Sequence, residues 1–355
     1  MKPIIFRENK YSFTEITKLK KSTKVREVID LYKEQLEELY EIEHPSEKFD
    51  PDFAKKSREF INSTRSKNGS NLGDWIFYPW NGQVIHMVNK NQYEIIHTNR
   101  NQNIITSEEQ KKLSQSVVGV VGLSIGNAMA VSMAYTGVGG VIKMSDFDVL
   151  STSNLNRIRA GIGYVGKSKI DITSQQIYEI NPYIKLDLYQ NGLKTKELDG
   201  FLNGKSKPQV IFEAIDDFEM KIRLRLEAKK SKVPVVMLTN LGDSLLIDIE
   251  RYDTEKNVQV FNGLIGNAAK DILSKPITEA DKQKYAVQIV GMQNVPQRVL
   301  DSVMQVNKTL VGRPQLMSTV TIGGGIAAMI ARKIILGEKI KSGRTRIVFD
   351  DYLLK

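Results

Sequence analysis

The pattern of apolar positions changes from helical to strand-like within the first hundred residues. Apolar side chains recur at helical spacing between positions 25 and 40 and stop at His44-Pro45, which predicts one amphipathic helix. Short apolar runs separated by turns such as Asn81-Gly82 then predict three strands, with the sequences DWIFYPW, VIHMV and YEIIH. We therefore expect a small N-terminal α+β domain, a helix plus a hairpin, over residues 1–98.

Residues 99–355 show a different pattern, in which apolar strands alternate with helices. A capping box at Thr106 predicts a helix that leads into the first strand. The expected order is then strand Val117–Val121, helix Asn127–Tyr135, strand Val141–Asp146, helix Lys167–Ile180, strands Ile184–Tyr189 and Gln209–Ile215, helix Phe218–Lys230 and strand Val233–Thr239. This alternation predicts an α/β fold with a doubly wound, mostly parallel Rossmann-like sheet. Leu245–Tyr252 and Val258–Phe261 are expected to pair as antiparallel strands, and a last helix is expected from Thr321 to Leu336.

The uncharged stretch Leu113–Ile142 is long enough to span a bilayer. Six glycines divide it into strand, turn, helix, turn and strand, which is typical of a parallel sheet and argues against a membrane partner. The N-terminal residues lack the apolar core and cleavage site of a secretory signal, so we expect a cytoplasmic protein.

Composition narrows the chemistry. The 355 residues include no cysteine, which excludes disulfides, cysteine zinc sites and thioester intermediates on the enzyme. The net charge is +10, with 16 basic and 15 acidic residues in 1–98 and 35 and 26 in the remainder. An anionic partner is therefore expected to meet the larger domain.

The string VVGVVGLSIGNA places Gly122–Gly126 on a turn between a strand and a helix. Such a Gly-x-Ser-x-Gly turn is the nucleophile elbow of serine hydrolases, which would make Ser124 the nucleophile. That fold needs a histidine after the serine, and His44, His86 and His97 all precede it. A phosphate-binding turn, in which backbone N–H groups and a helix N-terminus approach an anion, is therefore favoured over a hydrolase. A packing turn without a ligand is the remaining alternative.

Further polar residues follow the expected strands. Asp146 ends the second strand twenty positions after Gly126, where nucleotide-binding units place an acid on ribose hydroxyls, an arrangement that a nicotinamide dehydrogenase would share. The pyrophosphate of a dinucleotide needs little beyond the Gly loop. A triphosphate that is cleaved needs several cations on its phosphates and a carboxylate that holds Mg²⁺. The side chains that fit this demand come later in the chain and are Asp148, Asn154, Asn156, Arg157, Lys169 and Asp216. The structural alternative is a surface salt bridge for Arg157 and Lys169 and a helix N-cap for Asp216.

At these positions the sequence resembles the ThiF/MoeB and ubiquitin-activating-like adenylyltransferase superfamily. The resemblance covers about residues 100–350, is strongest in SDFDVLSTSNLNR, and continues through Lys169, the INP at 180–182 and Asp216. It implies ATP and Mg²⁺ as cofactors, with Asp216 on the metal. Arg100, in HTNRN, matches the position of an arginine finger that often acts across a homodimer interface. The implied nucleotide contacts are Gly122, Ser124, Gly126, Asp146 and Asp148 for the nucleotide and Asn154, Arg157 and Lys169 for the phosphates.

The chain departs from the family pattern at the Gly loop, and Glu213 and Asp217 stand where an Asp and an Asn are usual. The resemblance implies adenylation of a carboxylate or amide, and the missing cysteine implies attack by a nucleophile of the substrate. The layout is nearest to peptide-modifying enzymes of the microcin C or pantocin type. We therefore expect residues 1–98 to hold a peptide, at a sheet edge beside Trp75, Phe77, Tyr78 and Trp80 of DWIFYPW; the alternative is that these aromatic residues only pack this domain onto the main one. The alternatives are a tRNA-modifying dehydratase, favoured by the basic charge, and an inactive nucleotide-binding module.

Overall fold

The computed structural model describes residues 1–68, 72–274, 278–349 and 351, and the chain forms two compact units. The first unit comprises Met1–Gln110 together with Tyr178–Tyr183, and the second comprises Lys111–Ile177 and Ile184–Lys355. Each unit has its own sheet.

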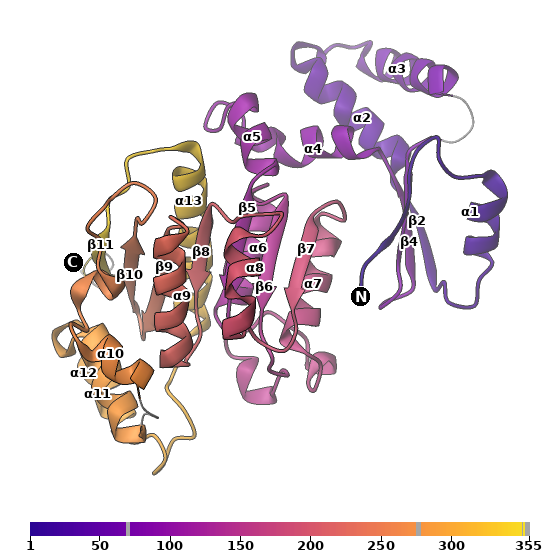
Figure 1. Ribbon diagram of the computed structural model, residues 1–355. Helices are drawn as coiled ribbons and strands as arrows, with labels where there is room; N and C mark the ends of the chain where they lie inside the picture. The colour runs from indigo at the N-terminus through magenta and orange to yellow at the C-terminus, as the bar shows by residue number, and fades with distance from the viewer. Residues whose placement is uncertain (69–71, 275–277, 350, 352–355) are drawn as a thin grey trace. The chain divides into compact units, whose positions relative to one another are not determined.

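The first unit is built around a four-stranded sheet, of which Figure 1 labels β2 and β4. The strand order is β1-β3-β4-β2, and only β2 and β4 pair in parallel. Its core is apolar and aromatic. The elements are β1 Ile4–Phe6, α1 Phe13–Lys20, β2 Glu27–Asp30, α2 Tyr32–Glu43, η1 Pro45–Glu47, α3 Phe53–Asn68, β3 Asp74–Tyr78, β4 Gln83–Met87, α4 Lys90–Thr98 and η2 Asn99–Asn101.

Two expectations for this unit are wrong. The expected helix covers β2 as well as α2, because the apolar residues of a short strand happened to continue the helical spacing of α2. The run YEIIH is helical: Asn89 accepts hydrogen bonds from the backbone of Asn91 and Gln92 and caps α4. This local capping box outweighs the strand preference of the isoleucines.

The second unit contains a seven-stranded sheet in the order β11-β10-β9-β8-β5-β6-β7. Strands β9, β8, β5, β6 and β7 are parallel, and β10 and β11 extend the sheet as antiparallel strands. The elements are α5 Ser107–Ser114, which begins before the unit boundary, β5 Val117–Val121, α6 Gly126–Tyr135, β6 Val141–Ser145, η3 Thr152–Asn154, η4 Ile162–Tyr164, α7 Lys169–Ile180, β7 Lys185–Tyr189, η5 Thr195–Glu197, α8 Leu198–Asn203, β8 Val210–Glu213, α9 Phe218–Lys230, β9 Val235–Leu241, β10 Ser244–Glu250, η6 Val260–Gly263, α10 Ala268–Ser274, α11 Glu279–Val290, η7 Met292–Asn294, α12 Gln297–Val303, α13 Met317–Leu336 and β11 Gly343–Val348.

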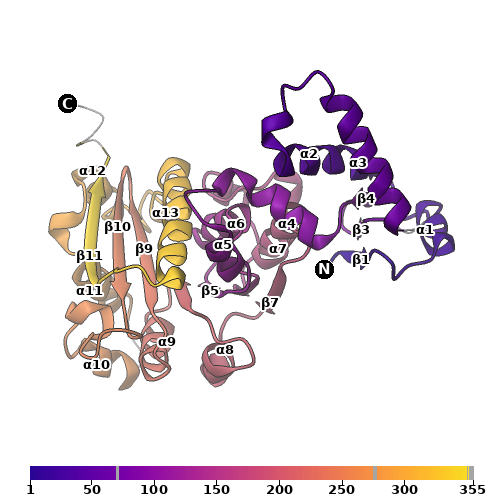
Figure 2. The same cartoon turned by 90° about the horizontal axis from the view of Figure 1, so that it is seen from above.

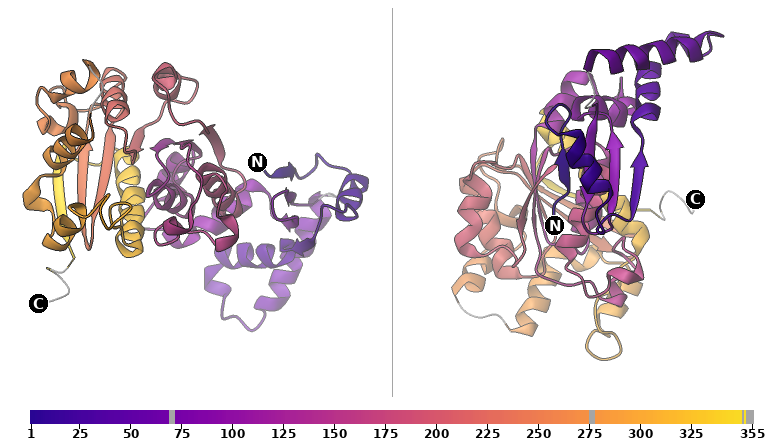
Figure 3. Two further views of the ribbon diagram at one scale, coloured as in Figure 1. Left: turned by 90° about the horizontal axis from the view of Figure 1, so that it is seen from below. Right: turned by 90° about the vertical axis from the view of Figure 1, so that its right-hand side faces the viewer.

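Helices cover both faces of this sheet, which confirms the predicted doubly wound α/β fold (Figure 2). Helices α6 and α13 pack together on one face, where Gly324 lies so close to α6 that a Cβ atom would come within 2.7 Å of the Ala128 carbonyl oxygen. Helices α8 and α9 cover the other face around Phe201 and Leu224. The orange helices of Figure 3, α10 to α12, gather beside β9 and β10.

One further expectation is wrong, because Val258–Phe261 is not a strand. The antiparallel partners of β10 are β9 and β11. Residues 260–263 form a short 3₁₀ turn in which Phe261 adopts a left-handed backbone with φ of 53°. The Phe261 N–H donates to the buried carboxylate of Glu250 at 2.7 Å, and this bond replaces a strand pairing.

Among the described residues, one helix, α13, is long and apolar enough to cross a membrane by length and composition. Half of its residues are buried, and it packs against α6 and three strands of the sheet. It is therefore a core helix of the second unit.

Candidate functional site

The Gly122–Gly126 turn follows β5 and leads into α6. Gly122 has a φ of +91°, and a Cβ atom there would lie 2.5 Å from the Ala214 carbonyl oxygen. At Gly126 a Cβ atom would lie 2.8 Å from a methyl group of Val120. Both positions therefore require glycine, and the turn carries its backbone N–H groups to the carboxyl ends of the parallel strands.

Asp146, directly after β6, holds this turn in place. Its two carboxylate oxygens accept hydrogen bonds from the backbone N–H groups of Leu123, at 2.6 Å, and Asp148, at 2.7 Å. Burial raises the pKa of Asp146 above its ordinary value, against the opposing effect of these hydrogen bonds and of Lys169. A carboxylate has about four lone-pair sites, so Asp146 can still accept from a ligand's hydroxyl groups.

Lys169, the first residue of α7, pairs with Asp148 and lies near Asp146. Its Nζ atom donates to the Asp148 carboxylate at 2.7 Å, and its backbone N–H donates to the Asp148 carbonyl at 3.0 Å. The Lys169 side chain is 7% exposed, whereas that of Asp148 is 51% exposed. The structure therefore holds a nearly buried ammonium group beside the Gly loop.

Arg157 reaches the same turn from the loop after β6. Its Nε–H lies 3.2 Å from Ser124 Oγ, and its Nη1 donates to Asn156 Oδ1 at 2.9 Å. Burial lowers the pKa of Arg157, and the charge of Asp216 opposes that effect. Ser124 thus contacts a guanidinium group, and none of the three histidines follows it in the chain, which fits an anion site better than a nucleophile.

Asp216 lies beyond β8, and its side chain is 89% exposed. Its carboxylate pairs with Arg313 at 2.6 Å. The N-cap of α9 is the neighbouring Asp217, which accepts from the Met220 N–H at 3.1 Å. Helix capping therefore does not account for Asp216, whose carboxylate faces solvent where a metal ion can reach it.

The loop that carries Asp216 rests on a buried ionic cluster. Glu213 accepts from Lys221 and Arg225, each at 2.7 Å, and from the Ile215 N–H at 2.9 Å. Arg225 also donates to Glu250 at 2.7 Å, and its guanidinium lies 3.8 Å from the ring centroid of Phe261. Two carboxylates thus face two cations, and the glutamate that departs from the family pattern anchors the start of the Asp216 loop.

The side chains of two predicted site residues are not joined to these contacts, although the backbone carbonyl of Asn154 accepts from the Arg157 N–H at 3.0 Å. Asn154 is the last residue of the 3₁₀ turn η3 and closes its capping box, because its side-chain oxygen accepts from the N–H of the N-cap Ser151 at 3.2 Å. Arg100 is an exposed residue of η2 and belongs to the first unit, whereas the other site residues belong to the second. The roles of both residues stay predictions.

The structure adds two residues that the sequence did not indicate. Arg313 reaches Asp216 from the segment between α12 and α13, and no motif marks it. Asn127, in the first turn of α6, is buried and donates to Thr173 at 2.9 Å and to Gln176 at 2.7 Å, while its side-chain oxygen has no hydrogen-bond partner among the described residues. The only feature of the sequence that could have indicated Asn127 as a site residue is its position directly after the Gly loop.

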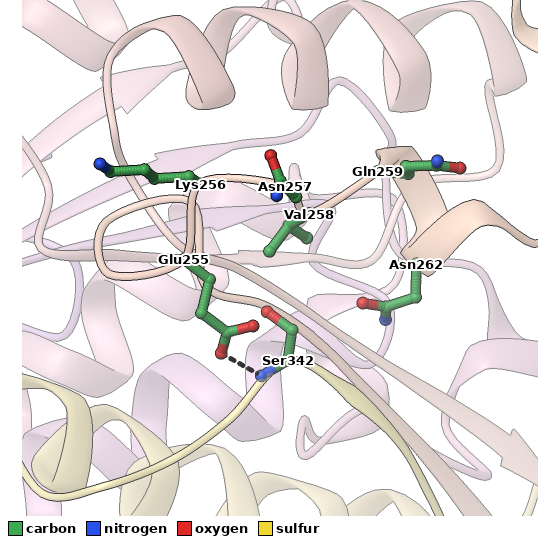
Figure 4. Close-up of a pocket in the computed structure, with 7 residues that line it drawn as sticks. All are labelled: Glu255, Lys256, Asn257, Val258, Gln259, Asn262 and Ser342. Carbon is green, nitrogen blue, oxygen red and sulfur yellow. Dashed lines mark hydrogen bonds between the residues drawn. The ribbon is translucent and has the colours of Figure 1, made fainter.

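A cavity of about 680 Å³ lies elsewhere in the second unit (Figure 4). It lies beyond the end of β10 that pairs with the start of β9, and so at the amino end of the parallel strands. Its lining shares no residue with the predicted nucleotide site, which lies at the carboxyl ends, and one Glu255 carboxylate oxygen in it is occupied by the Ser342 N–H at 2.7 Å. We assign it no part in nucleotide binding.

The structure thus places a Gly turn, the carboxylate of Asp146 and the cationic groups of Lys169 and Arg157 at the carboxyl ends of the parallel strands of an α/β sheet. Residues 98–353 match the model of the ThiF family, and the chain belongs to that family. An uncharacterized Mycobacterium tuberculosis protein is 37% identical over 273 residues, which cover 77% of this chain. The chain spans only 37% of that relative's length.

Other similar proteins are more distant. The Bacillus subtilis tRNA threonylcarbamoyladenosine dehydratase is 27% identical over 43% of this chain and 59% of its own length. Among solved structures, PaaA has a TM-score of 0.49 at 19% identity, covering 73% of this chain and 68% of its own. Escherichia coli MccB with MccA-N7isoASN has a TM-score of 0.47 at 16% identity, covering 68% and 63%.

Proposed function

We propose that this chain is an ATP-dependent adenylyltransferase, in which a substrate carboxylate or amide oxygen attacks the α-phosphate of ATP and releases pyrophosphate. The observation that carries the proposal is that Asp146 and Arg157 both contact one Gly turn at the carboxyl ends of the parallel strands, while Lys169 pairs with Asp148 beside Asp146. Asp146 would accept from the ribose hydroxyls, and the two cations would neutralise charge on the phosphates. Asn154 would add a hydrogen bond to the phosphates.

The residues present fit a magnesium ion delivered with ATP. Among the described residues there is no group of three or more His, Cys, Asp or Glu side chains that could hold a metal ion. Magnesium needs only one or two carboxylates when phosphates supply other ligands, and the exposed Asp216 offers one. Bound there, the ion would neutralise charge on the phosphates, while Arg313 would add a cation from the protein.

The chain has no cysteine to take over the activated acyl group. A nucleophile of the substrate or of a second substrate therefore attacks the adenylate, which favours cyclisation, amide or N–P bond formation, or dehydration. The sheet of the second unit has to position the reactants, because proximity and charge neutralisation account for most of the catalysis in this scheme.

We propose a peptide as the substrate, held by the first unit in the cytoplasm, as in ribosomal natural-product modification. Strand β3 does not offer the expected edge: it lies between β1 and β4, and Trp75, Phe77 and Tyr78 are at most 6% exposed. The edges are β1 and β2, and on β2 Val28 is 43% exposed. An extended peptide can add a strand at such an edge.

Transfer RNA is the second candidate substrate, because residues 99–355 carry nine more basic than acidic side chains and tRNA dehydratases are among the relatives. Exchange of labelled pyrophosphate into ATP, measured with peptides from short reading frames next to the gene and with total tRNA, tests the proposal. Peptide-dependent exchange is the expected result. No exchange with either substrate would favour an inactive nucleotide-binding module, and a tRNA mobility shift that salt abolishes would favour tRNA.

We also propose a homodimer in which Arg100 acts on the neighbouring subunit's ATP. Arg100 is an exposed residue of a short turn ahead of the second unit, and an arginine in such a segment can cross a twofold interface. Mixing inactive Arg100→Ala subunits with inactive Asp216→Asn subunits should restore part of the activity, because one active site in the heterodimer is complete. Heterodimers that form without any activity would contradict action in trans.

A further inference from the structure

A second cavity lies within the first unit, between α1 and the four-stranded sheet, and has a volume of about 260 Å³. Ile16 and Lys20 of α1 line it on one side, and Trp75 of β3 and His86 of β4 line it on the other. Tyr32 and Arg65 also line the cavity. None of these residues has a part in the nucleotide site.

The wall of this cavity is a fixed aromatic stack. Trp75 and His86 are parallel, with ring centroids 4.1 Å apart, and His86 and Tyr32 follow at 4.9 Å. The two nitrogens of His86 lie 2.9 Å from the Asp30 carboxylate and 2.8 Å from the Leu72 carbonyl oxygen, which fixes the ring. A wall held in this way is ordered before any ligand arrives, so binding costs little conformational entropy.

Two charged side chains line the cavity, Lys20 and Arg65, and both are cationic, while the Asp30 carboxylate lies behind His86. Lys20 Nζ lies 3.9 Å from the ring centroid of Trp75, and Arg65 reaches the cavity from α3. Neither forms an ion pair with any residue that the structure describes, and no carboxylate lines the cavity. The lining is therefore apolar and positive, which complements an apolar group joined to an anion.

Tyr32 continues the aromatic wall of the cavity. The residue is 2% exposed, and its hydroxyl has no hydrogen-bond partner in the described part of the chain. Burial raises the pKa of Tyr32 to about 12, so the hydroxyl keeps its proton at neutral pH. Because that hydroxyl oxygen is itself buried, Tyr32 contributes its ring to the wall and no hydrogen bond to the ligand.

We propose that this cavity is a specificity site that holds one bulky apolar residue of the substrate together with an adjacent carboxylate. Its volume lies just below the range of about 300–1,000 Å³ that takes a whole small-molecule ligand, so it suits a single residue of a longer chain. The inference rests on the proposed peptide substrate and names the sequence feature by which the first unit selects it: an aromatic or large aliphatic side chain beside an acid.

The test uses the full-length chain without ATP, so that its outcome is independent of adenylation. The chain has two tryptophans, and Trp80→Phe leaves Trp75, in the cavity wall, as the only indole reporter. Titration with N-acetyl-phenylalanine should change the Trp75 fluorescence saturably, with at least about 10-fold tighter binding than the uncharged N-acetyl-phenylalaninamide. This ratio corresponds to about 1.4 kcal/mol, within reach of one charge-assisted hydrogen bond.

Matched variants locate the effect. Lys20→Gln and Arg65→Gln should each reduce the preference for the acid over the amide at least about threefold. Lys18→Gln removes the same charge from the same helix outside the cavity lining, and it should leave the preference unchanged. Saturation-transfer NMR on the unmodified chain repeats the acid and amide comparison without fluorescence.

Equal binding of acid and amide by both methods, no binding by either, or an equal loss in Lys18→Gln would overturn the proposal. Selective binding of the acid in a chain that shows no pyrophosphate exchange would uphold the cavity and count against adenylation alone. Exchange with a peptide that lacks any carboxylate beside an apolar residue, unaffected by Lys20→Gln, would count against the cavity alone.

Discussion

Replacing Asp216 by Asn, or Arg157 by Ala, is expected to lower the turnover of ATP to AMP and pyrophosphate at least about 100-fold, because each change removes a charge that acts on the phosphates. Asp216 is exposed and pairs with Arg313, itself half exposed, so its loss should change stability by no more than about 1 kcal/mol. The measurement is pyrophosphate release with the true substrate, alongside the melting temperature.

Two neighbouring residues provide the controls. Asp217→Asn removes the same charge one position along, and Asn is as good an N-cap for α9 as Asp. Arg159→Ala removes a guanidinium two positions from Arg157. Both controls should keep wild-type turnover within about threefold, because the loss is expected only where charge meets the phosphates. Wild-type turnover in Asp216→Asn and Arg157→Ala would remove these residues from the mechanism.

The parts of the fold that the sequence predicted are those in which local and tertiary preferences agree. The strand Val117–Val121 and the helix Phe218–Lys230 have the predicted bounds. A buried parallel strand is an apolar run between turns, and α9 has a strong cap at its start. β11 was missed because it is an edge strand with the polar sequence GRTRIV, which joins the sheet only through its pairing with β10.

The candidate site was also predicted only in part. The motif spacing indicated Asp146, Lys169 and Asp216, because the carboxyl ends of parallel strands meet at one edge of a sheet. It did not indicate Arg313, since a contact 97 residues away along the chain leaves no periodicity in the sequence. Nor did it show why Glu213 replaces a shorter acid: the reason is the distance that its side chain spans to Arg225 and Lys221 in the interior.

That buried cluster gives the largest expected effect on stability. Arg225→Met should lower the stability of the second unit by about 3–5 kcal/mol, because it leaves Glu213 and Glu250 buried with Lys221 as the one remaining cation of the cluster. For a unit of this size the loss corresponds to a fall in melting temperature of roughly 10 °C. Circular dichroism melts measure it. Arg223→Met, on the same helix, removes an exposed pair with Glu219 and should cost less than about 1 kcal/mol.

The pH dependence of the stability loss in Arg225→Met shows whether the variant loses charge compensation or packing. Burial alone would raise the pKa of Glu213, but Lys221 and Arg225 outweigh it and hold that pKa below its ordinary value. A lowered pKa stabilises the wild type fully above the ordinary value, about 4.3, and this contribution is lost as the pH falls through the lowered one. In Arg225→Met the carboxylates instead gain from protonation. The difference in melting temperature should therefore be largest near pH 7 and shrink as the pH falls, starting above the ordinary value of about 4.3, where the variant takes up protons, and continuing below it, where the wild type does. A difference that stays constant with pH would assign the loss to packing of Arg225 against Phe261.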